Sequence, residues 1–354
     1  MIARTRSSAV SFLSPLIGWR GLLLLLGLAL AWLALRNMAW DQAWGQVAGM
    51  GTGAILILLG LNLAMLPLMT VRWWLLLRAL GAPVRLSTVC AYRFAGNAVS
   101  YLTPGPHFGG EPLLVYLLRQ RQDISLSPAA TSVALDRILE LLASIVVLSC
   151  SLIMLTVTGS GPFAGKWALP LAVTLAAAVV ALLAALCMGK RPLSRICHLF
   201  MRVCGMAHCA PTCFGGPLLE ALMEGEALTE SLLRRHRRLF LLANLYSLGH
   251  WLGVFVEFWL MAALLGQSLS FSQLLTVVIA ARLAFLTPLP AGLGVLESTL
   301  PWVTAALGLG SVPGLSLCLL IRVRDILFSL AGLGLALKYL TCPGRASTLT
   351  KNAG

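Results

Sequence analysis

Residues 102–111 read LTPGPHFGGE, and residues 286–297 read LTPLPAGLGVLE. Each stretch begins Leu-Thr-Pro-x-Pro, continues with glycines and ends in a glutamate, Glu111 or Glu297. Prolines and glycines in such number interrupt a straight helix. Each glutamate is followed 25 residues later by a second charged group, which starts at Asp136 in one case and at Arg322 in the other. The equal spacing predicts two copies of one structural unit.

The composition places both motifs in a membrane. Of the 354 residues, 59% are hydrophobic and 11% are charged, whereas soluble domains have roughly 45–50% apolar and about 25% charged residues. So few charges cannot cover a surface that faces water, which excludes a soluble enzyme. Long leucine runs, 10 Trp and 12 Phe exclude a disordered chain.

Six apolar runs are long enough to cross a bilayer core of about 30 Å as helices. Two further apolar stretches, 94–118 and 273–309, contain the motifs and are predicted to be re-entrant hairpins, because neither continues as one helix. The expected fold is an all-α polytopic membrane protein. The predicted spans are 16–36, 47–71, 128–157, 167–189, 239–265 and 311–337.

Basic residues are distributed unevenly between the two sides that these spans define. With a cytoplasmic N-terminus, 20 of the 26 Lys and Arg residues fall in cytoplasmic segments, Arg72 and Arg93 among them, and only Arg36 and Lys166 lie outside. The positive-inside rule then predicts that both termini are cytoplasmic. The bias explains the net charge of +14 without a nucleic-acid partner. The first run also fits a cleaved signal peptide, but the charge pattern requires it as a span.

The order of elements is the same in two halves. Residues 1–158 hold two spans, a hairpin and a span; residues 159–340 repeat this order and include a cytoplasmic loop at 190–238; residues 341–354 form a short tail. Because each half crosses three times, the second half is predicted to be inverted. Inverted halves with broken segments at corresponding positions indicate an alternating-access transporter with a site near the midplane.

Ten ionisable residues are predicted to lie at membrane depth. Each costs about 2.5–3.5 kcal/mol at a helix centre unless it is paired or faces a polar cavity. One interpretation is a cavity in which Arg137, Arg282, Arg322 and Arg324 bind an anionic headgroup, since arginine suits bidentate phosphate contacts. The alternative is a set of ion pairs that lock the halves together and touch no ligand. The ten residues are Glu111, Asp136, Arg137, Glu140, Glu257, Arg282, Glu297, Arg322, Arg324 and Asp325.

Glycines next to the two breaks complete the predicted substrate site. They could open half-helices whose N–H groups face a phosphate or carboxylate. Alternatively, they only permit a tight hairpin. Glu111 and Glu297 are in addition candidates for proton or cation coupling. The glycines are Gly109, Gly110, Gly292 and Gly294.

Other candidates are weaker. Cysteines and histidines crowd residues 197–213, but they include no C-x-x-C pair and fit no standard zinc spacing, so reduced cysteines are expected. Residues 217–233 read as an amphipathic helix, either on the membrane surface or solvated. His107 and His250 either relay protons or are core donors. No Ser/His/Asp order, Walker loop or HExxH motif occurs, so neither an enzyme nor a cofactor is expected.

One combination of motifs runs along nearly the whole chain: residues 72–78, Gly96-Asn97, 102–105, 109–111, Asp136-Arg137, Pro288, Pro290, 292–294, Glu297 and Arg324-Asp325. In this combination the chain resembles the lysylphosphatidylglycerol synthase transmembrane-region family, which is also described as flippase-like. The resemblance implies a multi-pass protein of the bacterial inner membrane that moves or presents a lipid. That lipid would be a phospholipid, a glycolipid or a hopanoid-related lipid.

Two features depart from the family pattern. The namesake carries a soluble aminoacyl-transferase domain after its membrane part, whereas this sequence ends shortly after its last predicted span, so it is not expected to be the synthase. Residues 106–108 make the first motif one residue longer than usual. Leu114 stands where many relatives carry a polar or basic residue, so no headgroup contact is assigned to it.

Three hypotheses therefore stand for the function. The first is a lipid translocase that acts by alternating access on an anionic or modified lipid. The second is an accessory protein that transports nothing and docks a lipid-biosynthetic enzyme through the basic residues between 234 and 238. The third and least favoured is an integral-membrane transferase, for which Asp136 or Glu140 would supply the general base.

Overall fold

The computed structural model describes residues 39–103, 109–159, 161–187, 237–287 and 289–341, with isolated positions before 39 and between 225 and 235. Within these ranges all regular structure is helical, which confirms the expected all-α class. The span predicted at 16–36, residues 104–108, most of the loop 190–238 with its Cys/His cluster, and the tail lie outside the described residues. The elements are α2 (Trp40–Ala48), α3 (Thr52–Ala79), α4 (Leu86–Leu102), α5 (Glu111–Gln122), α6 (Leu126–Thr158), α7 (Ala168–Cys187), α10 (Arg237–Leu264), α11 (Phe271–Phe285), the short 3₁₀ turn η2 (Pro290–Gly292), α12 (Val295–Ala306) and α13 (Ser311–Thr341).

Three of the described helices are long and apolar enough to cross a membrane: Thr52–Ala79, Leu126–Thr158 and Arg238–Leu264. They correspond to α3, α6 and α10, and α7 and α13 lie where two further spans were predicted. Helix α3 continues beyond the predicted end at residue 71, because Arg72 is buried there among carboxylates instead of ending the span. The broken stretches each form two helices, α4 with α5 and α11 with α12.

The outer surface of the bundle is apolar, and its interior holds charged groups. Arg72, Arg93, Asp136 and Glu257 are each at most 2% exposed. A soluble domain has the opposite arrangement, because its charged groups stay in water. The molecule therefore fits a lipid environment. On α10 alone, the exposed apolar residues at helical spacing are Leu241, Leu245, Leu248, Leu252, Val256 and Trp259.

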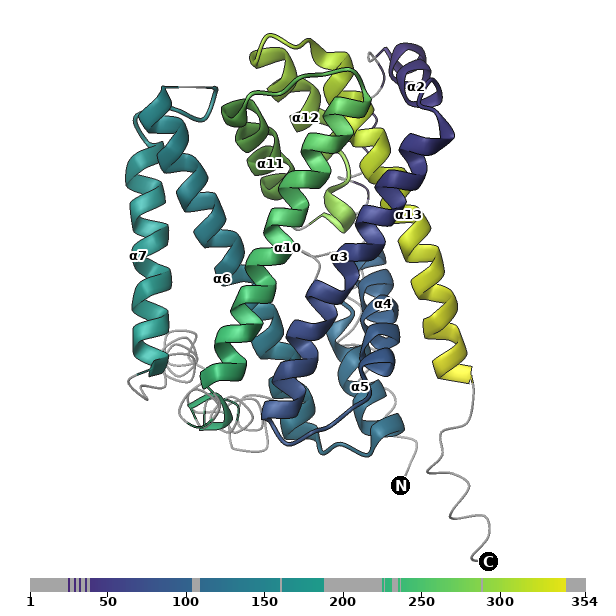
Figure 1. The fold of residues 1–354 in the computed structure, drawn as a ribbon, viewed down its shortest axis with the longest axis vertical. Helices are drawn as coiled ribbons and strands as arrows, with labels where there is room; N and C mark the ends of the chain where they lie inside the picture. The colour runs from purple at the N-terminus through teal and green to yellow at the C-terminus, as the bar shows by residue number, and fades with distance from the viewer. Residues whose placement is uncertain are drawn as a thin grey trace, which may run out of the picture.

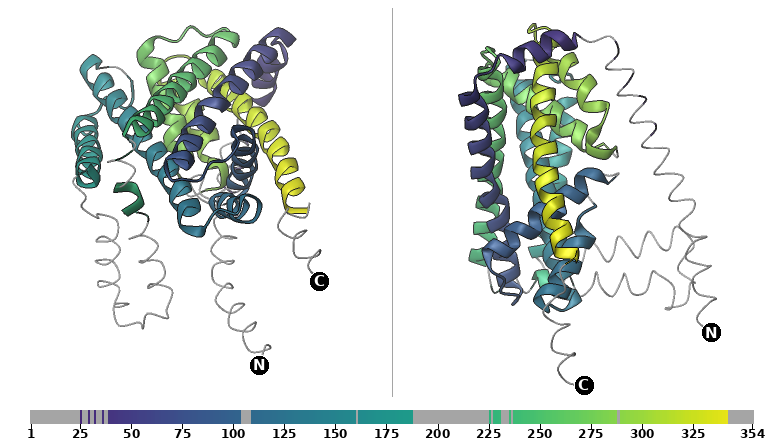
Figure 2. Two further views of the ribbon diagram at one scale, coloured as in Figure 1. Left: turned by 60° about the horizontal axis from the view of Figure 1, so that its bottom comes forward. Right: turned by 90° about the vertical axis from the view of Figure 1, so that its right-hand side faces the viewer.

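The long helices run through the full height of the molecule, and the broken segments occupy its two ends. Helix α10 packs along α3, α13 packs along α4, and α7 packs against α6. Figure 1 shows α4 and α5 in the lower half and α11 and α12 in the upper half. The right-hand view of Figure 2 shows the same separation along α13. Each broken segment therefore lies at its own end of the bundle.

Corresponding helices begin at a nearly constant spacing along the chain. In each pair the second helix begins 184 or 185 residues after the first. The two halves therefore contain helices in the same order. The pairs begin at Thr52 and Arg237 (α3, α10), Leu86 and Phe271 (α4, α11), Glu111 and Val295 (α5, α12), and Leu126 and Ser311 (α6, α13).

A glycine allows α13 to approach α4 closely. A Cβ atom added at Gly332 would lie 2.3 Å from the carbonyl oxygen of Phe94 and 2.8 Å from the Cβ of Ala98. Gly334 lies on the same helix, and a Cβ there would have no neighbour within 4 Å. The two positions therefore separate the effect of packing from the effect of helix propensity.

We predict that Gly332→Ala lowers the free energy of unfolding by about 1–3 kcal/mol, the usual cost of overpacking. Gly334→Ala should leave it unchanged or raise it slightly, because alanine favours a helix over glycine. Thermal unfolding of both variants in detergent measures the difference. Equal melting temperatures for the two variants would contradict the close α4–α13 contact.

Candidate functional site

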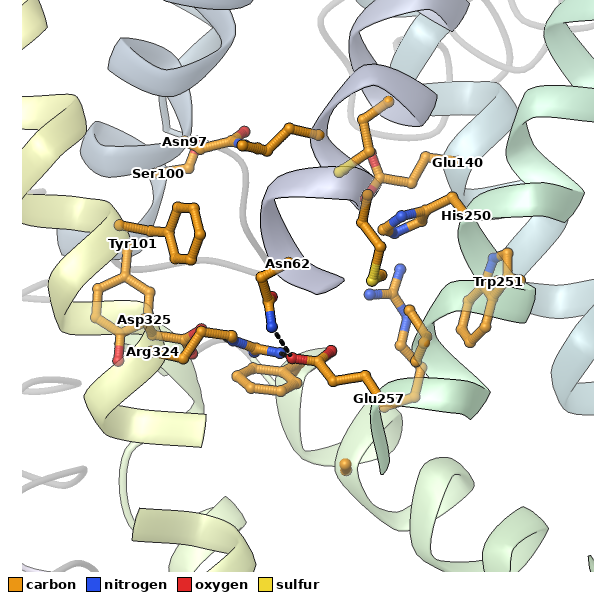
Figure 3. Close-up of a pocket in the computed structure, with 18 of the residues that line it drawn as sticks. Asn62, Asn97, Ser100, Tyr101, Glu140, His250, Trp251, Glu257, Arg324 and Asp325 are labelled. Carbon is orange, nitrogen blue, oxygen red and sulfur yellow. Dashed lines mark hydrogen bonds and ion pairs between the residues drawn. The ribbon is translucent and has the colours of Figure 1, made fainter. Parts of the chain in front are cut away.

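A cavity of about 280 Å³ lies between α3, α4, α6, α10, α11 and α13. Figure 3 shows that it brings together side chains from both halves of the chain. Its walls combine apolar and aromatic residues with a few polar ones, the usual composition of a ligand pocket. The ionisable residues in the lining are Tyr101, Arg137, Glu140, His250, Glu257, Arg282, Arg324 and Asp325.

Behind one wall of the cavity, α3, α4 and α6 are joined through one carboxylate. Asp136 accepts from Arg72 at 2.7 Å with one oxygen and pairs with Arg93 through the other. Both arginines were predicted to lie in cytoplasmic segments, and that prediction was wrong, since they are 1% and 2% exposed. They belong to the buried charges, and the positive-inside bias loses two of its residues.

Two more carboxylates extend this network to α5. Glu140 lies 2.9 Å from the Nη1 atom of Arg137 and 3.3 Å from the Nη2 atom of Arg72. Glu111, the first residue of α5, forms an ion pair of 2.7 Å with the Nε atom of Arg137. Three arginines and three carboxylates thus form a connected network without net charge. We call these six residues the lower network.

A second cluster joins α3, α10 and α13 at the cavity. Arg324 contacts Glu257 at 2.6 Å and Asp325 at 2.8 Å. The side-chain amide of Asn62 donates to the same oxygen of Glu257 at 2.8 Å (Figure 3). One arginine and two carboxylates give this cluster a net charge of −1 when both acids are ionised. We call Arg324, Glu257 and Asp325 the upper network.

Arg322 and Glu297 hold the second break in the chain. Arg322 lies 2.7 Å from Glu297 and donates to the carbonyl oxygen of Ala291 at 2.8 Å. The other oxygen of Glu297 accepts from the N–H group of Gly294 at 2.8 Å. Non-helical backbone at membrane depth needs such partners for its polar groups. Both side chains therefore serve the break, and neither lines the cavity.

Arg282 has no carboxylate within salt-bridge distance in the described ranges, unlike the other arginines of the cavity wall. Its Nη2 atom donates to the Ser144 hydroxyl at 2.6 Å. Its guanidinium group lies 5.4 Å from the centre of the Trp251 ring, within the range of a cation–π contact. Hydrogen bonding and stacking therefore orient this cation beside the cavity.

The glycines at the first break lie against α4. The N–H groups of Gly110 and Gly109 point to the Ser100 hydroxyl, at 2.8 and 3.4 Å. A Cβ atom on Gly110 would lie 1.9 Å from the carbonyl oxygen of Gly96, so only glycine fits there. Close packing thus accounts for Gly110, and substrate binding by these N–H groups stays a prediction.

The structure brings together part of the predicted site. Arg137, Arg282, Arg324 and Asp325 line the cavity. The other predicted site residues lie behind its wall or at the two breaks. Sequence reasoning missed Arg72, Arg93, Asn62 and Trp251 as parts of the site or its support. One signal was present: Arg72 and Glu257 lie 185 residues apart, at equivalent places on α3 and α10. The residues outside the lining are Asp136, Glu111, Gly109, Gly110, Gly292, Gly294, Glu297 and Arg322.

Long apolar helices, a lipid-compatible surface and buried ion pairs define an integral membrane protein. The model of the family "Lysylphosphatidylglycerol synthase TM region" matches residues 18–332. The chain belongs to this family, and the resemblance stated from its motifs is confirmed. No curated protein and no solved structure matches the chain.

We predict that Asp136→Asn strongly destabilises the protein, by about 3–5 kcal/mol, because it leaves two buried arginines without their shared carboxylate. Asp123→Asn is the matched control. Asp123 is exposed and has a φ of 53°, a conformation that asparagine tolerates. Thermal unfolding in detergent is the measurement, and equal melting temperatures for both variants would contradict the role of Asp136.

Proposed function

We propose that this protein is a translocase for an anionic or modified membrane lipid and that it performs no chemical reaction. It would act by alternating access in the bacterial inner membrane, and its main partners would be membrane lipids. The family is consistent with lipid handling. A lipid-biosynthetic enzyme as an additional partner remains part of this proposal.

The observation that carries the proposal is the polar cavity among the membrane helices. Charged groups at membrane depth are costly and are found where they pair or face a polar cavity. Most of the buried charges pair with one another, but Arg282 on the cavity wall has no acidic partner among the described residues. A cation held in this way suits a ligand that brings a negative charge.

The arrangement of the halves supports alternating access. We infer six spans and two re-entrant segments arranged as inverted repeats, as the spacing of 184 or 185 residues and the opposite placement of the broken segments suggest (Figure 1). The lower network ties α3 to α6, and the upper network ties α10 to α13. Exchange of these ties on the two sides of the cavity is a plausible basis for opening to one side at a time.

Glu111 and Glu297 have corresponding tasks in this proposal. Each ties the second helix of a broken segment to the long helix that follows, through Arg137 in one half and Arg322 in the other. Movement of a broken segment would therefore be transmitted to α6 or α13. In this proposal both residues keep the coupling role expected from the sequence.

The charges at the helix ends support a cytoplasmic side at the lower end in Figure 1. Arg78 ends α3, Arg85 precedes α4, Arg119 lies in the last turn of α5, and Lys338 lies in the last turn of α13. These ends lie together in Figure 1. Lys166 stands in the link between α6 and α7, at the other end. The positive-inside rule then gives the orientation.

Reporter fusions test this orientation. Alkaline phosphatase is active only outside the cytoplasm, so we expect it to be active when fused after Gly165 and inactive when fused after Lys338. A green fluorescent protein at the same two positions should give the reverse result. The opposite pattern would overturn the proposed orientation.

Transport is tested with the full chain in liposomes that contain fluorescent phosphatidylglycerol. We expect wild-type protein to exchange this lipid between leaflets faster than protein-free liposomes, and Arg282→Gln to be at least about tenfold slower, because loss of a charge-assisted hydrogen bond is worth about 1.5–3 kcal/mol. Arg78→Gln removes the same charge from an exposed residue and should keep the wild-type rate. Wild-type protein without any lipid exchange would instead favour the accessory role.

A further inference from the structure

One wall of the cavity contains several buried nitrogen atoms that lack a hydrogen-bond partner. Among the described residues these are the Nε atom of Arg282, the Nη2 atom of Arg137 and the Nδ1 atom of His250. The three residues come from α11, α6 and α10, and all of them line the cavity. Buried polar groups are nearly always satisfied in proteins, so unpartnered ones at a cavity indicate a ligand. We call this surface the α6–α10–α11 wall.

The side chain of Arg282 is fixed in a position that leaves its Nε atom available. Ser144 accepts from its Nη2 atom at 2.6 Å, and the Trp251 ring lies 5.4 Å from its guanidinium carbon. A guanidinium group that is already oriented loses little entropy when it binds an anion. The wall is therefore a built site, unlike an isolated arginine at the surface.

The charges around the cavity limit the charge of the ligand. The lower network of Arg72, Arg93 and Arg137 with Glu111, Asp136 and Glu140 is neutral, so Arg282 adds one positive charge to this wall. The upper network, on α10 and α13, has a net charge of −1 and repels further negative charge. One negative charge, placed at Arg282, suits this distribution better than two.

The other two arginines of the predicted headgroup site are already engaged. Arg322 is bound to Glu297 and to the carbonyl oxygen of Ala291 at the second break. Arg324 is held by Glu257 and Asp325. Their ion pairs would have to break before either could bind a ligand. The available donors are therefore those of the α6–α10–α11 wall.

We propose that the α6–α10–α11 wall binds the singly charged phosphodiester of a ligand, with Arg282 as the main contact and Arg137 and His250 as additional donors. This inference rests on the proposed function, because it specifies the headgroup that the cavity receives. A phosphodiester carries one negative charge and two free oxygens that accept hydrogen bonds from converging donors. A membrane phospholipid and a free phosphodiester share this chemistry.

Calorimetric titration of the full chain in detergent tests the inference. The probes are dioctanoyl phosphatidylglycerol, the uncharged dioctanoylglycerol and the water-soluble dimethyl phosphate. We expect phosphatidylglycerol to bind at least about tenfold more tightly than dioctanoylglycerol, since a hydrogen bond to a charged group corresponds to about a tenfold change or more. Competition by dimethyl phosphate would assign the site to free phosphodiesters as well, and its absence would assign it to the lipid.

Variants locate the binding site. Arg282→Gln should weaken phosphatidylglycerol binding at least about tenfold. Ser144→Ala, which removes the group that orients Arg282, should weaken it to a smaller extent. Arg78→Gln is the matched control and should bind as the wild type does. If Arg282→Gln does not fold, Ser144→Ala decides the test.

Equal affinities for phosphatidylglycerol and dioctanoylglycerol would overturn the inference, and so would full phosphatidylglycerol binding by folded Arg282→Gln or, if that variant fails to fold, by Ser144→Ala. The transport assay fails independently. Binding that depends on Arg282, without lipid exchange by the wild type, would contradict the translocase proposal and leave this site in place. Lipid exchange that does not depend on Arg282, together with unchanged binding, would overturn the site alone.

Discussion

A charge inside a lipid bilayer needs an opposite charge or a polar cavity beside it, and this constraint determines how the interior of the protein is built. Asp136 shows the effect most clearly, because it binds Arg72 from α3 and Arg93 from α4. No pair of these helices could separate without leaving a buried charge unpaired. The same ion pairs that hold the helices together thus define the walls of the cavity and leave Arg282 available there.

The two breaks in the helices obey a related constraint. Backbone groups freed by a break need partners where no water is available. The first break uses a neutral group, the Ser100 hydroxyl, which faces the N–H group of Gly110. The second uses the ion pair of Arg322 and Glu297, which reaches the carbonyl of Ala291 and the N–H group of Gly294. Equivalent segments are therefore stabilised by different chemistry.

The sequence predicted the helical class, the positions of several spans and the charged motifs near the breaks, because apolar length and Pro/Gly interruptions are local features. It did not predict that Arg72 and Arg93 are buried, since depth in the bundle depends on partners from distant segments. It also assigned Arg322 and Arg324 to one headgroup site. Residues two positions apart on a helix point about 200° apart, so both could not face the same cavity. Only the fold shows that Arg324 lines it.

The central claim is that the cavity receives the charged part of a lipid at Arg282. A cryo-electron microscopy structure of the full chain in nanodiscs that contain phosphatidylglycerol tests it most directly. The account predicts headgroup density inside the cavity, with a phosphate oxygen within hydrogen-bond distance of the Arg282 guanidinium group. A cavity that contains only water, with lipid phosphates confined to the two membrane surfaces, would contradict it.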